Sequence, residues 1–443
     1  MSRKKWGGTM VSKNPIKAIF DFKREEFPVV LLMFLFSLFV MAIFQILKPL
    51  KKGLFLEAFG ADIELYAKLL NIAAAALGVI AFTFLYNKLP RQRLIYSFCL
   101  FFAASFLTLF FLLDYPHPAV IWIFYIIGDL TTTLLVPSFW AYLTDISSPI
   151  QAKRLFGLMG AGLTVGGVFG STLNEIYIQK LGHQYLMLIS AILMVLVLII
   201  TFVAESLVRR TGTFGQAVPG EPPKKEPFQR RSRLAAAIEG AKLALRSKYL
   251  AAIVGIMAFY EFASQLMEYL FSKAAEILPG TTVTQSFINS VYLKANVIAA
   301  IVQIFLVSFI VRRFGLSFAL CVLPVTAIAS SGGYLFLPSL TTAALLIISD
   351  NGLNYSLQQT ARETLYVPTS PDEKYKARAF TNMFVQRLAK GIAILGIMGV
   401  RSAGVPLSVI SLAAIVVLAI MAMLGIYDGR RFNEMTMRKD THG

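Results

Sequence analysis

The stretch that decides the fold joins two unlike pieces, LMLISAILMVLVLIITFVAE at residues 186–205 and SLVRRTGTFGQAVPGEPPKKEPFQRRSRL at residues 206–234. The first piece has the length of about twenty apolar residues that a helix needs to cross the roughly 30 Å hydrocarbon layer of a membrane. The second piece is rich in Gly, Pro, Lys and Arg, which predicts that the apolar helix ends there. The pair therefore predicts a membrane span followed by a basic connection.

Similar apolar runs repeat on both sides of this connection. They predict twelve spans, at 27–47, 65–87, 95–113, 119–141, 156–177, 186–205, 249–272, 286–310, 317–337, 339–361, 378–400 and 405–427. The domains that follow are a basic N-terminal segment at 1–26, a six-helix half at 27–205, a basic linker at 206–248, a second half at 249–427 and a tail at 428–443. Two six-helix halves joined by a linker are typical of the major facilitator fold, an all-α membrane fold.

The composition also indicates a polytopic membrane protein. Of the 443 residues, 57% are hydrophobic and 15% are charged, against roughly 25% charged in soluble proteins, and the mean hydropathy is +0.68. A soluble enzyme, a coiled coil and a disordered chain are thereby excluded. The 42 Lys and Arg against 24 Asp and Glu give a net charge of +18. In a membrane protein such an excess marks cytoplasmic loops, so we expect no nucleic-acid partner.

The basic clusters fall on alternate connections, which predicts the orientation. The N-terminus, the linker and Arg312–Arg313 are examples, whereas the loop at 114–118 has no Lys or Arg. We therefore expect a multi-pass membrane protein with both termini in the cytoplasm. Lys48, Lys51 and Lys52 depart from this rule because they follow the first predicted span on the outer side. They either snorkel at a helix end or contact an anion at the mouth of a path.

Several ionisable residues lie near the middle of predicted spans, where charges are costly and mark substrate paths, proton relays or internal ion pairs. They are Asp129, Glu261, Lys294, Asp350, Arg387 and Lys390, with Lys68 nearer the outer third. Arg387 and Lys390 are three residues apart and therefore share a helix face. Two interpretations stay open for this pair. The two cations form ion pairs with Asp350 or Glu261, or they bind a multiply charged anion.

The remaining sequence motifs give less information about function. No His, Cys or Ser pattern has the spacing of a metal site or a catalytic triad, so we expect no enzyme activity, no metal and no cofactor. The glycine-rich run at 157–170 lacks the preceding strand and the Gly-Lys-Ser/Thr ending of a phosphate-binding loop. It predicts close helix packing instead. Four tyrosines near the charged spans could each stack on a base, and the sequence does not choose among Tyr66, Tyr260, Tyr292 and Tyr355.

Three segments carry a resemblance to a known family. NYSLQQTARETLYVPTS at 354–370, followed by EKYKARAF at 373–380, combines a basic-acidic pair, an aromatic residue, a proline and a Lys-rich turn. FW at 139–140 with TDISS and AKRLFG at 144–157 forms the second segment, and residues 47–60 form the third. These segments resemble the nucleotide transporter family, the ATP/ADP translocases of plastids and obligate intracellular bacteria. The resemblance runs through most of the chain at low identity.

The resemblance implies a major-facilitator-like fold and exchange of ATP for ADP, or related nucleotide transport. The family's span-1 lysine is matched by Lys51, its late-span lysine by Lys390 and its span-4 acidic residue by Asp129. Its acidic residue near the start of span 8 has no match in TTVTQSF at 281–287. This difference keeps open a major facilitator transporter of another organic anion or amphipathic small molecule, with or without proton coupling.

Residues and resemblance together give one set of expectations. We expect a monomer in the lipid bilayer of the bacterial inner membrane that moves a small anionic substrate, with a nucleotide as the leading candidate. The candidate substrate-binding residues are Lys51, Lys68, Lys294, Arg387 and Lys390. The candidate coupling or gating residues are Asp129, Glu261 and Asp350.

Overall fold

The chain is almost entirely helical in the part that the computed structural model describes, which comprises residues 24–88, 91–113, 117–212, 239, 241–243 and 246–442. Most of the predicted N-terminal segment and most of the linker lie outside this part. The α-helices are α2 (Phe27–Lys88), α3 (Arg91–Leu112), α4 (Pro118–Ile146), α5 (Pro149–Thr211), α7 (Lys248–Ala275), α8 (Thr281–Ile301), α9 (Val307–Phe336), α10 (Leu340–Leu353), α11 (Gln359–Leu365), α12 (Pro371–Phe380), α13 (Gln386–Ser402) and α14 (Leu407–His442). Three π-helical turns are continuous with them, η1 (Val302–Leu306), η2 (Asn354–Gln358) and η3 (Thr381–Val385).

Seven helical stretches of the described chain are long and apolar enough to cross a membrane. Three of them are divided by a glycine whose backbone leaves the helical region, at Gly60, Gly182 and Gly315. Each of these glycines has φ near 80°, a conformation that L side chains rarely adopt. The all-α membrane fold class is therefore confirmed. The count of twelve spans stays a prediction, because α10–α11 and α12–α13 are not among the seven stretches.

The first predicted span ends too early. The sequence-based limit of residue 47 rests on Pro49 and the neighbouring lysines, but the first segment of α2 continues as a helix until Gly60. A proline inside a membrane helix is tolerated where neighbouring groups compensate for the lost backbone hydrogen bond. The lysines that follow residue 47 therefore lie within a helix rather than in an outer loop.

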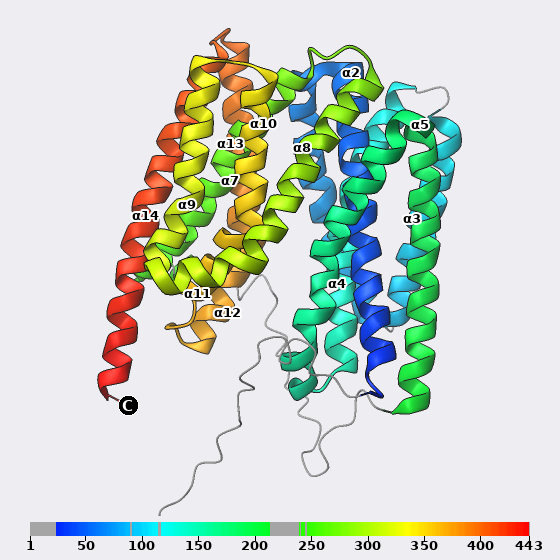
Figure 1. Ribbon diagram of the computed structural model, residues 1–443, viewed down its shortest axis with the longest axis horizontal. Helices are drawn as coiled ribbons and strands as arrows, with labels where there is room; N and C mark the ends of the chain where they lie inside the picture. Colours follow the sequence, from blue (N-terminus) through cyan, green and yellow to red (C-terminus); the bar gives the residue numbers. More distant parts are fainter. Residues whose placement is uncertain are drawn as a thin grey trace, which may run out of the picture.

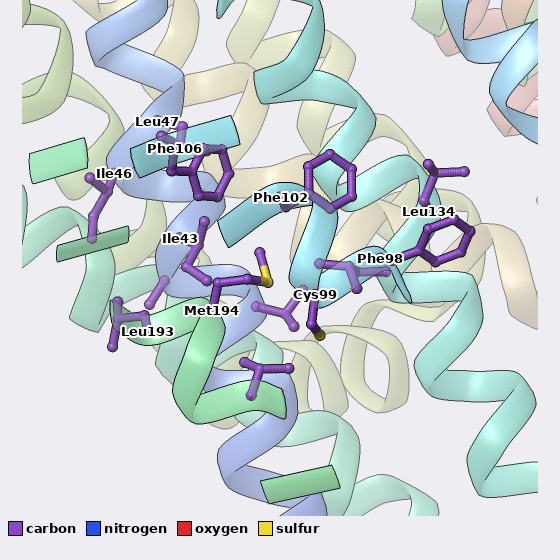
Figure 2. Packing of buried hydrophobic residues seen from close by; sticks show 14 of the residues in the cluster. Ile43, Ile46, Leu47, Phe98, Cys99, Phe102, Phe106, Leu134, Leu193 and Met194 are labelled. Carbon is purple, nitrogen blue, oxygen red and sulfur yellow. The ribbon is translucent and has the colours of Figure 1, made fainter. Parts of the chain in front are cut away.

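The helices form two bundles, α2–α5 and α7–α14, that approach each other at one end of the molecule (Figure 1). Each bundle has its own hydrophobic core. In the first bundle, residues such as Ile43, Phe102, Phe106 and Met194 interlock from α2, α3 and α5 (Figure 2). We call the end with the α7–α8 turn the Gly60 end and the opposite end, with α11, α12 and the C-terminus, the Gly315 end (Figure 1).

The glycine-rich run lies where α5 packs directly against the backbone of α2. Gly162, Gly166 and Gly170 are four residues apart and therefore share one face of α5. A Cβ atom at Gly166 would lie 2.1 Å from the carbonyl oxygen of Leu38, and one at Gly170 would lie 2.3 Å from that of Ala42. No side chain fits between backbones at these distances. The predicted role in close helix packing is confirmed.

This packing gives a first expected result. Gly166→Ala should destabilise the fold by about 1–3 kcal/mol, the usual cost of forcing an extra carbon into a packed contact. The midpoint of thermal unfolding in detergent, followed by size-exclusion chromatography, measures the loss. Gly157→Ala is the matched control on the same helix, because a Cβ atom there meets nothing within 4 Å. Equal midpoints for the two variants would contradict the packing role.

Candidate functional site

A cavity of about 720 Å³ lies between the two bundles. Its walls come from α2 and α4 on one side and from α7, α8, α10–α11 and α12–α13 on the other. Its charged lining residues are Lys48, Lys51, Lys52, Glu64, Lys68, Asp129, Glu261, Glu268, Asp350, Arg362, Glu363, Arg378, Arg387 and Lys390. The eight cations exceed the six carboxylates, so the lining carries an excess of positive charge that suits an anionic ligand.

The lysines that follow the first predicted span point into this cavity. Lys51 is 5% exposed and forms an ion pair with Asp129, which also accepts a hydrogen bond from Asn71. The Lys51 ammonium lies 4.5 Å from the centre of the Tyr125 ring. Snorkelling is therefore the wrong interpretation for Lys51 and its neighbours. A lysine on an inward face of the bundle meets acids of neighbouring helices instead of water at a helix end.

A second buried network lies deeper, toward the Gly60 end. Lys52 is 3% exposed, and its Nζ lies 3.2 Å from Glu64 Oε1 and 3.0 Å from Glu268 Oε1. Lys68 lies 3.4 Å from the other oxygen of Glu268, and the Tyr125 hydroxyl donates to Glu64 at 3.0 Å. Glu268 comes from α7, so these ion pairs join the two bundles. The charges of two lysines and two glutamates cancel in this network.

The opposite wall carries the two cations that the sequence placed on one face of a helix. Lys390 Nζ lies 3.3 Å from Glu261 Oε2, and the Lys390 side chain is still 42% exposed to the cavity. Arg387 lines the same cavity and forms no ion pair with any residue of the described chain. Asp350 does not pair with Arg387 or Lys390 but accepts a hydrogen bond from the Ser264 hydroxyl at 2.7 Å. Of the two interpretations left open, internal pairing holds for Lys390 and not for Arg387.

The lining continues to the Gly315 end through α11 and α12. Arg362 donates to the side-chain oxygen of Asn354 at 3.0 Å, and its guanidinium lies 5.2 Å from the centre of the Tyr260 ring. Arg378 forms an ion pair with Glu363 and lies 5.1 Å from the ring of Tyr366. These arginines form a basic entrance that leads toward Arg387 and Lys390.

Seven of the eight sequence-predicted site residues line this one cavity, and Lys294 does not. The seven are Lys51, Lys68, Asp129, Glu261, Asp350, Arg387 and Lys390. Lys294 is exposed on α8. Tyr292, two residues earlier, faces the cavity, and two helical residues are about 200° apart around the axis. Lys294 therefore lies on the far face of α8.

Sequence reasoning missed five charged lining residues, Glu64, Glu268, Arg362, Glu363 and Arg378. Helical spacing could have found two of them. Glu268 follows Glu261 by seven residues, and Glu64 precedes Lys68 by four, so each shares a face with a residue that was identified. Arg362 and Arg378 lie at predicted span ends, where basic residues are common. Only the structure shows that these two arginines line the cavity.

A further polar cluster joins the two bundles at the Gly60 end. Asp62 accepts hydrogen bonds from the Tyr269 hydroxyl at 2.5 Å and from Lys273 at 3.0 Å, and Arg401 lies 3.4 Å away. Glu276 accepts a hydrogen bond from the backbone N–H of the residue after Gly60 at 2.9 Å. Each of these contacts joins α2 to α7, to the residue that follows α7, or to α13. We call Asp62, Tyr269, Lys273, Glu276 and Arg401 the latch.

Comparisons with known proteins agree with this architecture. The family model described as Major Facilitator Superfamily matches residues 33–394. The chain is 23% identical to ADP,ATP carrier protein 5 of Rickettsia bellii, over 78% of this chain and 81% of that protein. It is also 23% identical to the plastidic ATP/ADP-transporter of Solanum tuberosum, over 90% of this chain and 72% of that protein. The resemblance stated from the sequence is therefore confirmed.

Solved structures show the same fold. A bacterial homologue of the human lysosomal transporter Spinster, in an inward-facing and unoccupied conformation, superposes with a TM-score of 0.60 at 14% identity, over 94% of this chain and 99% of that chain. The nucleoside transporter NupG, in a mutant form, also superposes with a TM-score of 0.60 at 14% identity, over 92% and 99% of the two chains. At this identity the likeness concerns the fold alone.

Proposed function

Because this chain belongs to the Major Facilitator Superfamily, we propose that it is a secondary transporter that carries nucleotides across a membrane by alternating access. The observation that carries the proposal is the excess of cations in the central cavity, with Arg387 free of any acidic partner in the described chain and Lys390 open to the cavity. Phosphate groups suit such cations, because a guanidinium and an ammonium on one face offer several charge-assisted hydrogen bonds. The ADP,ATP carriers among the relatives support a nucleotide as the substrate.

Alternating access is supported by the asymmetry of the two ends. The latch and the Lys52–Glu268 pair join the bundles at the Gly60 end, whereas the lining reaches Arg378 at the other end. These contacts support a state open at the Gly315 end. With both termini in the cytoplasm, as the basic loops predict, this state faces inward. Substrate would leave or enter there until the latch opens and the bundles rock to the opposite arrangement.

Uptake into proteoliposomes tests the proposal. We expect labelled ATP to enter vesicles preloaded with ADP and to enter empty vesicles much more slowly, which is the signature of exchange. Uptake into empty vesicles that depends on a proton gradient would instead indicate symport. Absence of uptake under both conditions, from protein shown to be folded by a cooperative thermal transition, would contradict nucleotide transport.

A second candidate is transport of another organic anion, coupled to protons. The observation that favours it is Asp350, which is 3% exposed, has no cation beside it in the described chain, and leaves its Oδ1 atom without a hydrogen-bond partner. Buried carboxyl groups of this kind serve as proton relays in membrane proteins. Thermal-shift measurements with a panel of anions discriminate the two candidates, because a ligand stabilises the protein according to its concentration relative to its Kd.

The latch gives a separate expected result. Asp62→Ala removes three contacts between the bundles and should raise the population open at the Gly60 end by roughly fivefold, since about 1 kcal/mol corresponds to that factor. The measurement is labelling of a cysteine placed at Ala75, a cavity-lining position, with a membrane-impermeant thiol reagent added at that end. Glu57→Ala is the control, because Glu57 is an exposed carboxylate of α2 without an ion pair in the described chain. Equal labelling in both variants would contradict the role of the latch.

A further inference from the structure

One of the tyrosines that line the cavity differs from the others because its ring is exposed. Five tyrosines line it, Tyr125, Tyr260, Tyr292, Tyr355 and Tyr366. Four of them are buried, at 3–5% exposure, and each has a cation of the protein 3.9–5.2 Å from its ring centre. Tyr355 is 55% exposed, and no cation of the described chain lies over its ring. Its face is therefore available to a ligand.

Two amides flank this ring along the same wall. Asn351 and Gln359 lie four residues before and after Tyr355, and all three line the cavity. Neither side-chain amide forms a hydrogen bond with a residue of the described chain. Each amide offers a donor and an acceptor, as the edge of a nucleobase requires. The ring sits on the π-helical turn η2, and single π-helical turns inside α-helices are frequent at functional sites.

The position of Tyr355 relative to the cations suits a nucleotide. Tyr355 lines the same cavity as Lys390 and Arg387, and its hydroxyl interacts electrostatically with Lys390. A ligand with its phosphates on Lys390 and Arg387 would therefore have the exposed ring of Tyr355 in the same cavity. Stacking on an aromatic ring tolerates any base, because every base has a π-face.

We propose that Tyr355 is the platform on which the nucleobase of the substrate stacks, with Asn351 and Gln359 at the edge of the base. This inference rests on the proposed nucleotide transport and assigns one substrate-binding residue within it. It also selects one of the four tyrosines that the sequence left equivalent. Tyr260 and Tyr292 already carry protein cations over their rings, and Tyr66 does not line the cavity.

The test compares two probes on the full-length protein in nanodiscs, ADP and inorganic pyrophosphate. Pyrophosphate has phosphates but no base. Tyr355→Leu should weaken ADP binding roughly fivefold to hundredfold, the range that stacking contributes, and should change pyrophosphate binding less than about twofold. Tyr355→Phe keeps the ring and should bind ADP as the wild type does. Tyr66→Leu is the matched control, because Tyr66 is equally exposed, at 56%, outside the cavity lining.

The outcomes separate the inference from the function on which it rests. If the wild type binds neither ADP nor ATP, the proposed function itself fails. If the wild type binds ADP but Tyr355→Leu binds it equally well, or loses ADP and pyrophosphate to the same degree, the platform is overturned and nucleotide transport stands. Should Tyr355→Leu not yield folded protein, Tyr355→Trp replaces it. Its indole fluorescence should then be quenched by ADP and not by pyrophosphate, and absence of quenching with ADP bound overturns the inference.

Discussion

Lys390→Ala should reduce ATP uptake by roughly a hundredfold while the protein still folds. A hydrogen bond to a charged group contributes about 1.5–3 kcal/mol, which is roughly a 10- to 150-fold change. The loss should lie toward the upper end, because the substitution also leaves Glu261 without its cation 3.3 Å away. An uncompensated carboxylate would then repel the phosphates that Lys390 is proposed to bind. Initial uptake rates in proteoliposomes measure the change.

Two variants serve as controls for this prediction. Lys294→Ala removes a lysine that the structure places outside the cavity, so its uptake should match the wild type. Combining Lys390→Ala with Glu261→Gln removes the repelling carboxylate as well and should recover part of the lost uptake. Wild-type uptake by Lys390→Ala alone would eliminate Lys390 as a substrate contact. Equal losses in Lys390→Ala and Lys294→Ala would point to a general effect of charge.

Glu268→Ala should produce the largest loss of stability among single substitutions in the cavity. Glu268 holds Lys52 at 3.0 Å and Lys68 at 3.4 Å, and both lysines are buried. Removing one partner of a buried ion pair leaves an uncompensated charge and costs about 3–5 kcal/mol. The midpoint of thermal unfolding should fall accordingly, and more than in Gly166→Ala.

A double substitution distinguishes an unpaired charge from a simple loss of packing. Lys52→Met together with Glu268→Met removes both charges and keeps similar volume, which is often neutral for a buried pair. Its unfolding midpoint should lie closer to that of the wild type than the midpoint of Glu268→Ala. If the destabilisation of the double variant equals the sum of its two single variants, the two side chains do not act as a pair.

The sequence alone determined much of the fold, for identifiable reasons. Apolar runs of membrane-spanning length are a local property, and they predicted the all-α membrane fold and the two halves around the linker at 206–248. The small residues of the glycine-rich run at 157–170 predicted a close helix contact, and the structure shows that Gly162, Gly166 and Gly170 make it. The first span was predicted to end at residue 47, which is too early, because this prediction also used only local properties of the sequence. Hydropathy registers the lysines after residue 47 as water-facing and has no information on their partners.

The cost of a charge inside a membrane also allowed most of the cavity to be predicted. Such a charge must face a partner or water, and seven of the eight selected residues line one cavity. Lys294 is the exception, because depth along a helix says nothing about the direction in which a side chain points. Arg362 and Arg378 were missed for the opposite reason, since they lie at span ends where charges are common.

Only the tertiary structure decided which of these charges neutralise each other and which remain available. Ion pairs such as Lys52–Glu268 join residues that are 216 positions apart in the chain, and their formation depends on the rotation and tilt of each helix. Hydropathy fixes neither quantity, because every face of a membrane helix is largely apolar. The same rotations leave Arg387 without an ion pair in the described chain and leave Tyr355 exposed in the same cavity. Sequence thus determined that charges lie within the membrane, and helix packing determined which of them can bind a substrate.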